Sequence, residues 1–122
     1  MNYALALALA LVFAVPAAAQ RAPISSPVDP DAERVAAHNL DVGRQYFKKK
    51  AWAGAKDRLE EILAEYPEFT RIDEVYYLLG VCYTKAGDAK LARESFRKLV
   101  DERPDSDYAK RAREELGRLG EP

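Results

Sequence analysis

Apolar residues recur every three or four positions from about residue 30 onward, and no alternation of apolar and polar residues lasts more than a few positions. This spacing gathers the apolar side chains on one face of a helix, whereas a half-buried strand needs a period of two. Three such sets lie at residues 52–66, 72–83 and 92–100. The pattern therefore predicts an all-α protein with no strand.

Capping residues mark where helices begin. Asp29, which is followed by a proline, can cap a first helix. Gly87 and Asp88 can end one helix and cap the next. Thr70, with Asp73 three residues later, resembles a capping box. These signals predict short turns between successive helices.

Two prolines mark where helices stop. Pro67 and Pro104 each follow a helical stretch that they cannot continue. Ser106 or Asp105 then offers the cap of a last helix, which we expect to run to about Leu119. Together these signals predict five helices.

The chain repeats itself at a shift of 37 positions, which carries Gly43 onto Gly80 and Gly80 onto Gly117. The same shift relates four further pairs, namely Tyr46 and Tyr83, Ala55 and Ala92, Leu59 and Phe96, and Pro67 and Pro104. A fixed period in this range, with two helices per unit, is typical of an α-solenoid of helical hairpins. Glycine within a helix costs about 1 kcal/mol relative to alanine, so we expect these glycines to allow close approach of a facing helix at Ala55 and Ala92.

The repeated positions resemble the tetratricopeptide repeat motif, which runs W-x2-L-G-x2-Y, then A-x3-F, then P. The second unit matches it with Tyr76, Leu79, Gly80, Tyr83, Ala92, Phe96 and Pro104, and departs from it only by tyrosine in place of tryptophan. The first unit matches more loosely, with Asn39, Val42, Gly43, Tyr46, Ala55, Leu59 and Pro67. The resemblance implies a fold of two repeats, at about residues 32–67 and 70–104, and a capping helix at about 106–119.

The resemblance also implies a function. The usual unit of the family has 34 residues, and the longer unit in this chain resembles the form found in repeat proteins of the bacterial envelope. Such repeats bind protein or peptide partners and have no active site of their own. We therefore expect the repeat domain, residues 32–120, to be a protein-binding module and not an enzyme.

The first nineteen residues carry no charged side chain and end in three alanines before Gln20. An apolar run with small residues at its end is typical of a secretory signal peptide, cleaved after Ala19. The apolar run, residues 3–15, is shorter than the roughly 20 residues that span a bilayer. We expect a periplasmic or secreted protein with a Pro/Ser-rich flexible linker at residues 20–31. The alternative is a retained segment that anchors the protein in the inner membrane.

Charge and motifs exclude several function classes. The 19 basic and 20 acidic residues leave a net charge of −1. This balance lacks the excess of positive charge that binds nucleic acid. The common phosphate-binding, acyl-transfer and zinc-protease motifs are absent from the sequence. His38 is the only histidine and has no second histidine or cysteine nearby. We therefore expect no metal and no cofactor.

The only cysteine, Cys82, cannot form a disulfide within the chain. It lies between Gly80 and Tyr83, and the family often has a small residue there. Because cysteine packs as a small hydrophobe, we predict a buried structural thiol. An intermolecular disulfide at Cys82 is the alternative.

Solenoids of helical hairpins bind partners on a concave surface lined by the first helix of each pair. The residues predicted to line this groove are Leu40, Arg44, Phe47, Lys48, Tyr77, Val81, Thr84 and Lys85. They mix aromatic and aliphatic groups with cations, which suits an extended or helical peptide with acidic side chains.

The sequence thus predicts an exported adaptor or scaffold of the bacterial cell envelope that binds a protein or peptide in this groove. The alternative is a membrane-anchored structural subunit of an envelope assembly, secretion or outer-membrane biogenesis complex. Two repeats are fewer than the roughly three that a stable array needs. We therefore also expect self-association or docking on a larger complex.

Overall fold

The computed structural model describes residues 28–120, which form five helices and no strand. The helices are α1 (Pro30–Lys48), α2 (Trp52–Glu65), α3 (Ile72–Lys85), α4 (Ala89–Glu102) and α5 (Asp107–Leu119). The predicted signal peptide lies outside the described residues, as does most of the predicted linker. The start of α1 at Pro30 falls within the last part of that linker.

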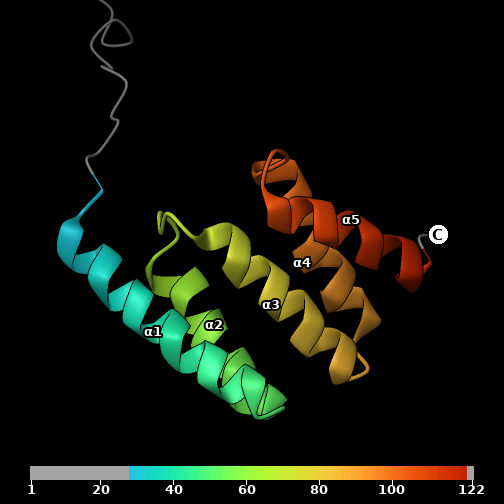
Figure 1. Cartoon of the computed structure of the whole chain (residues 1–122), viewed down its shortest axis with the longest axis horizontal. Coiled ribbons are helices and arrows are strands. Elements are labelled where there is room, and N and C mark those ends of the chain that lie inside the picture. Colours follow the sequence, from blue (N-terminus) through green and yellow to red (C-terminus); the bar gives the residue numbers. More distant parts are fainter. Residues whose placement is uncertain (1–27, 121–122) are drawn as a thin grey trace, which may run out of the picture.

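The five helices pack as two hairpins and a single helix. α1 pairs with α2 and α3 pairs with α4, while α5 packs against α4 and α3. In the view of Figure 1, α1, α3 and α5 lie side by side in a row in front of α2 and α4. This arrangement confirms the predicted α-solenoid of two helical hairpins and one further helix.

Three of the predicted caps are present. Asp29 accepts a hydrogen bond from the backbone N–H of Asp31 at 3.0 Å, with a proline opening α1. Asp88 and Ser106 cap α4 and α5 in the same way. Gly87 has a φ of 78°, a left-handed conformation that favours glycine at the end of a helix. Residues close in sequence therefore set these helix ends.

The predicted capping box at Thr70 is wrong. α3 begins at Ile72, and Arg71 precedes it without a side-chain cap. The hydroxyl and the backbone N–H of Thr70 instead donate to the carboxylate of Glu33 on α1. Asp73 accepts a hydrogen bond from the Ser106 hydroxyl at 2.6 Å. These two polar residues link α3 and the turn before it to the neighbouring units.

The glycines at the repeated positions have different surroundings. A Cβ added at Gly80 would lie 2.4 Å from the ring of Phe96, and one added at Gly43 would lie 3.3 Å from Leu59. Around Gly117 nothing lies within 4 Å of such a Cβ. The close approach predicted for the first two glycines is therefore present, but the nearest side chains are Leu59 and Phe96 and not the alanines.

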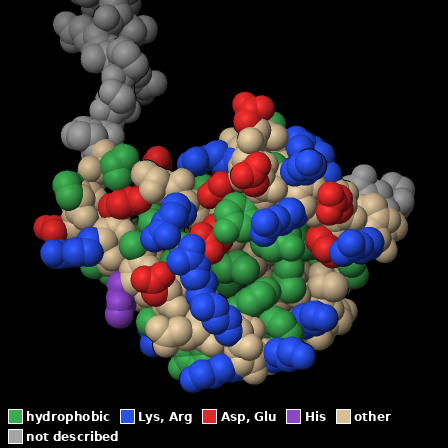
Figure 2. All heavy atoms as spheres, viewed as in Figure 1, with side chains coloured by type: hydrophobic (Ala, Val, Ile, Leu, Met, Phe, Trp, Pro, Cys, Tyr) green, Lys and Arg blue, Asp and Glu red, His purple; other side chains and the backbone are tan. Residues whose placement is uncertain are grey.

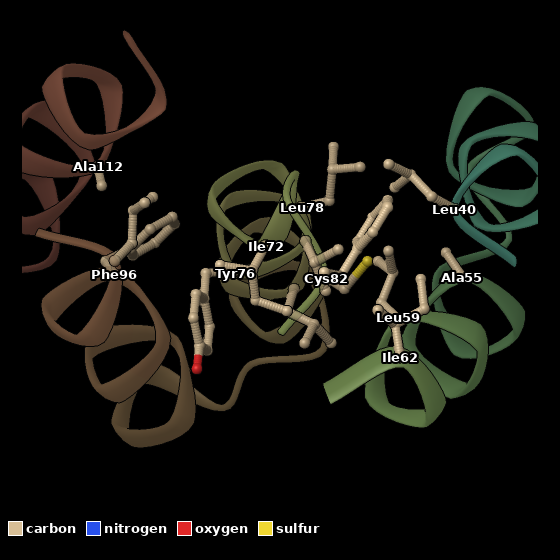
Figure 3. Packing of buried hydrophobic residues seen from close by; sticks show 14 of the residues in the cluster. Leu40, Ala55, Leu59, Ile62, Ile72, Tyr76, Leu78, Cys82, Phe96 and Ala112 are labelled. Atoms are coloured by element: carbon tan, nitrogen blue, oxygen red, sulfur yellow. The ribbon is translucent and has the colours of Figure 1, made fainter. Parts of the chain in front are cut away.

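The core runs through all five helices, and Figure 3 shows its centre around α3. Cys82 is 1% exposed and lies within this core, as predicted for a structural thiol. Phe69, in the turn before α3, is 2% exposed. The helical pattern did not single it out, because it lies outside a helix.

Burial of Cys82 predicts an unreactive thiol. Desolvation raises the pKa of Cys82 from its ordinary value of 9.0 to about 11, so the thiolate is about a hundredfold scarcer at pH 8 than in the unfolded chain. The unfolded chain ionises first as pH rises, so this contribution to stability is complete below pH 9 and is lost as pH rises through 11. We expect a thiol reagent to react at least tenfold more slowly with the native protein than with the protein in urea. Equal rates would contradict the burial.

Candidate protein-binding face

The first helix of each pair and α5 present one side to solvent, which we call the α1–α3–α5 face. Figure 2 shows this face, with hydrophobic side chains gathered over α3 and Lys and Arg side chains to either side of them. Tyr77 and Val81 on α3 and Tyr108 on α5 are partly buried hydrophobic residues that pack against the core. The face therefore offers both apolar and charged contacts.

An ion pair joins α1 to α3. The Arg44 guanidinium donates to both carboxylate oxygens of Glu74, at 2.6 and 2.5 Å, and also to Asp41 at 3.1 Å. The Glu74 side chain is 8% exposed and that of Arg44 is 34% exposed. The hydrogen bond to Glu74 raises the pKa of Arg44. This bidentate geometry fixes the position of α1 relative to α3.

Aromatic contacts join α3 to α4 and α5. The Tyr77 ring lies 5.6 Å from that of Tyr108 on α5 and 6.0 Å from that of Phe96 on α4, measured between centroids. Burial is the main cause that raises the pKa of Tyr108. Tyr77 thus belongs partly to the packing between units and partly to the surface.

Cations and aromatic rings meet at the C-terminal ends of α1 and α3. Phe47 packs edge-on against Trp52, with ring centroids 5.1 Å apart, and the Lys85 ammonium lies 5.8 Å from the Trp52 centroid. Lys48, which follows Phe47 in the last turn of α1, is exposed. Such a cluster can attract an acidic side chain while covering apolar surface.

The eight predicted groove residues are not all placed as expected. Leu40 is fully buried, and Figure 3 shows it directed from α1 toward α3; it therefore does not line an open groove. The Thr84 hydroxyl donates to the Gly80 carbonyl at 2.8 Å within its own helix. Lys48, Thr84 and Lys85 are exposed, while the other four are partly buried.

Glu74, Trp52 and Tyr108 contact residues of the face, but they were not among the predicted groove residues. Glu74 lies three residues before Tyr77, so helical spacing alone could have placed it on this side of α3. Tyr108 lies in the first turn of α5. Its contact with Tyr77 joins residues 31 positions apart, which a local pattern does not reveal.

Most repeat-motif residues are buried, with a few at the edges. The fully or nearly fully buried ones are Gly43, Ala55, Leu59, Tyr76, Leu79, Gly80, Ala92 and Phe96. Tyr83 is partly buried, and its hydroxyl donates to Glu60 on α2 at 2.5 Å. Tyr46, its counterpart in the first unit, is 40% exposed. Pro67 and Pro104 are exposed in the turns.

Residues 28–120 contain no group of three or more His, Cys, Asp or Glu side chains arranged to hold a metal ion. None of the helices described is both long and apolar enough to cross a membrane.

An array of helical hairpins whose first helices share one mixed apolar and charged face defines a class of α-solenoid proteins that bind other proteins. The sequence profile of the tetratricopeptide repeat matches residues 46–116, more than half of the chain. The chain belongs to the tetratricopeptide repeat family. Members of this family typically serve as protein-interaction modules without catalytic chemistry.

The chain is also similar to a known envelope protein. The outer membrane protein assembly factor BamD of Haemophilus influenzae is 30% identical over 77 residues, which are 63% of this chain and 29% of that protein. The chain therefore spans less than a third of the length of this relative.

Proposed function

We propose that this protein is an exported adaptor or scaffold of the bacterial cell envelope, which binds a protein or peptide on the α1–α3–α5 face. The observation that carries the proposal is the combination of Tyr77 and Val81 with the cations Lys48 and Lys85 on one side of the row of helices. The similarity to an outer membrane assembly factor supports a role in the envelope.

The chemistry of the face favours a partner with both apolar and acidic side chains. Val81 and the rings of Tyr77 and Tyr108 offer apolar contact area. Aromatic residues are enriched at protein interfaces. Lys48 and Lys85 stand at the C-terminal ends of α1 and α3, where they can pair with carboxylates. Arg44 is already paired with Glu74 and Asp41, so we assign it to holding the face together.

Charge reversal at the two exposed lysines tests this proposal. In a pull-down from envelope extracts, the variant Lys48→Glu with Lys85→Glu is expected to recover at least about tenfold less partner than the wild type, because like charges repel across an interface. Both side chains are exposed, so the helical circular-dichroism signal is expected to stay unchanged, while Tm is expected to fall modestly because Lys85 loses its contact with Trp52 and both new acids oppose a helix dipole. This pair is a cleaner probe than Tyr77, whose ring also packs on Phe96.

The matched control is Lys110→Glu, which reverses an exposed charge on α5. By helical spacing Lys110 points away from Tyr108 and so away from the α1–α3–α5 face. This variant is expected to recover the partner as the wild type does. If the double variant retained the partner as well as this control, binding on the proposed face would be rejected.

The second candidate is a membrane-anchored structural subunit of an envelope assembly, secretion or outer-membrane biogenesis complex. The apolar run at residues 3–15 favours it, if that segment is retained. The two candidates differ in the N-terminus of the mature protein. Cleavage after Ala19 leaves Gln20 as the first residue, whereas an anchored protein keeps the apolar run.

A further inference from the structure

The outer side of α1 carries exposed apolar residues that the proposed function does not use. Four large hydrophobic side chains are exposed among the described residues, and three of them are Val28 at 48%, Val35 at 41% and Tyr46 at 40%. Val42, which is partly exposed, falls between them at helical spacing. We call Val35, Val42 and Tyr46 the α1 outer stripe; Val28 lies just before α1, and Leu91 lies on α4.

The repeat shows what this stripe does in the next unit. The shift of 37 positions carries Val35 onto Ile72 and Val42 onto Leu79, which are 3% and 0% exposed. It carries Tyr46 onto Tyr83, whose hydroxyl bonds to Glu60 of the preceding unit. These positions on α3 therefore pack in the interior, where α3 meets the first hairpin.

Among the described residues no hairpin precedes α1, although the Tyr46 ring lies against Gly54 on α2. Figure 1 shows α1 at one end of the row of described helices. Exposed apolar side chains on a small domain often mark a site of contact with another protein, and the exposed imidazole of His38 lies between Val35 and Val42 by helical spacing. The described part of the array therefore ends in a helix side that carries both apolar and polar residues.

The charges beside the stripe differ between its two ends. Asp29 and Asp31 lie at the N-terminal end, and Lys49 and Lys50 lie directly after the C-terminal end. Glu65, at the C-terminal end of the antiparallel helix α2, adds an exposed acid beside the N-terminal end of the stripe. Asp31 also contacts Arg34 at 3.1 Å, but both side chains are about four-fifths exposed, so this pair holds the carboxylate only weakly.

We propose that the occupant is a second copy of this chain, bound through an antiparallel pairing of the two α1 outer stripes. In that arrangement the acidic end of each α1 lies against the basic end of the other, and Val35 of one copy lies near Val42 of its partner. A two-fold axis makes such a contact self-complementary. A parallel pairing would instead bring acid against acid and lysine against lysine.

The dimer is additional to the proposed partner binding and uses the opposite side of α1. Arg44 and Lys48 lie on the side of α1 turned toward α3, away from Val35 by helical spacing. Both interactions can therefore occur on one molecule. Because a single helix face is a small interface, we expect weak, concentration-dependent association.

Analytical ultracentrifugation of the protein as purified from expressing cells, up to about 1 mM, tests the proposal. The wild type is expected to approach twice its monomer mass at high concentration. Val35→Glu with Val42→Glu is expected to weaken association at least about tenfold, because each copy would bury two carboxylates in place of valines. Leu91→Glu, at a similarly exposed apolar position, is expected to associate as the wild type does. A wild type that is monomeric throughout, or a double variant that associates equally well, would overturn the proposal.

Charge reversal tests the antiparallel orientation. Lys49→Asp alone is expected to weaken the dimer, since it places acid against Asp31 of the other copy, and adding Asp31→Lys in the same chain is expected to restore it. A parallel pairing predicts no loss from the single change, because it replaces one like-charge contact with another. Recovery of the envelope partner by these variants is expected to match the wild type, so failure of the dimer and failure of partner binding can be told apart.

Discussion

Replacement of Gly80 by alanine is expected to lower the free energy of unfolding by about 1–3 kcal/mol. The added Cβ would lie 2.4 Å from the Phe96 ring, and Phe96 is fully buried, so a packed aromatic side chain must move. In a domain of this size each kcal/mol lowers Tm by about 4–8 °C. Urea unfolding followed by circular dichroism measures the loss.

The other two repeat glycines supply graded controls. Gly43→Ala is expected to cost less, because its Cβ would lie 3.3 Å from Leu59. Gly117→Ala is expected to be neutral or to stabilise by up to about 1 kcal/mol, since alanine favours a helix and nothing lies near the new Cβ. Phe96→Leu, which copies the first unit, is expected to recover part of the Gly80→Ala loss. Equal stability of Gly80→Ala and Gly117→Ala would refute the close packing.

Loss of Arg44 has the second largest expected effect. Arg44→Ala leaves the Glu74 carboxylate 8% exposed without its bidentate partner, and breaking one side of a buried pair is strongly destabilising. Because Arg44 is itself 34% exposed, we expect a loss of about 1–3 kcal/mol, below the full value for a buried pair. Chemical denaturation at neutral pH measures it.

Two further variants isolate the cause. Arg34→Ala removes an arginine whose pair with Asp31 is about four-fifths exposed on both sides, and it is expected to change stability by no more than about 0.5 kcal/mol. The double variant Arg44→Leu with Glu74→Leu removes the buried charge together with its partner. It is expected to restore most of the stability that Arg44→Ala loses. Equal losses for Arg34→Ala and Arg44→Ala would show that the ion pair does not hold α1 against α3.

Features set by neighbours in sequence were predicted correctly. The caps at Asp29, Asp88 and Ser106 each bond to a backbone N–H within three residues. The repeat period located Gly43 and Gly80, because a glycine within a helix has few explanations other than close packing. Local spacing and self-similarity were therefore sufficient for the helices, their order and the fold class.

Features set by residues far apart were missed. Thr70 resembled a cap but bonds to Glu33, and Arg44 was assigned to an open groove but pairs with Glu74, 30 residues away. Leu40 was placed on the same open side, although α1 packs against both α2 and α3 and buries it. A helical wheel shows which residues share a face but not which neighbouring helix covers that face.

Equivalent positions also differ because one unit lies at the end of the array. Tyr83 donates to Glu60 of the preceding unit, whereas Tyr46 is 40% exposed. The motif assigned both tyrosines to the same structural role. Position within the array therefore decides whether a repeat residue packs inside the protein or faces solvent.

Binding of a protein partner on the α1–α3–α5 face is the central claim of this account, and photo-crosslinking in intact cells tests it most directly. A photoreactive amino acid placed at Thr84, an exposed position at the C-terminal end of α3, is expected to give a covalent adduct with a partner protein. The same group at Lys110, on the outer side of α5, is expected to give none. Adducts from position 110 but not from position 84, or none from either, would contradict the claim.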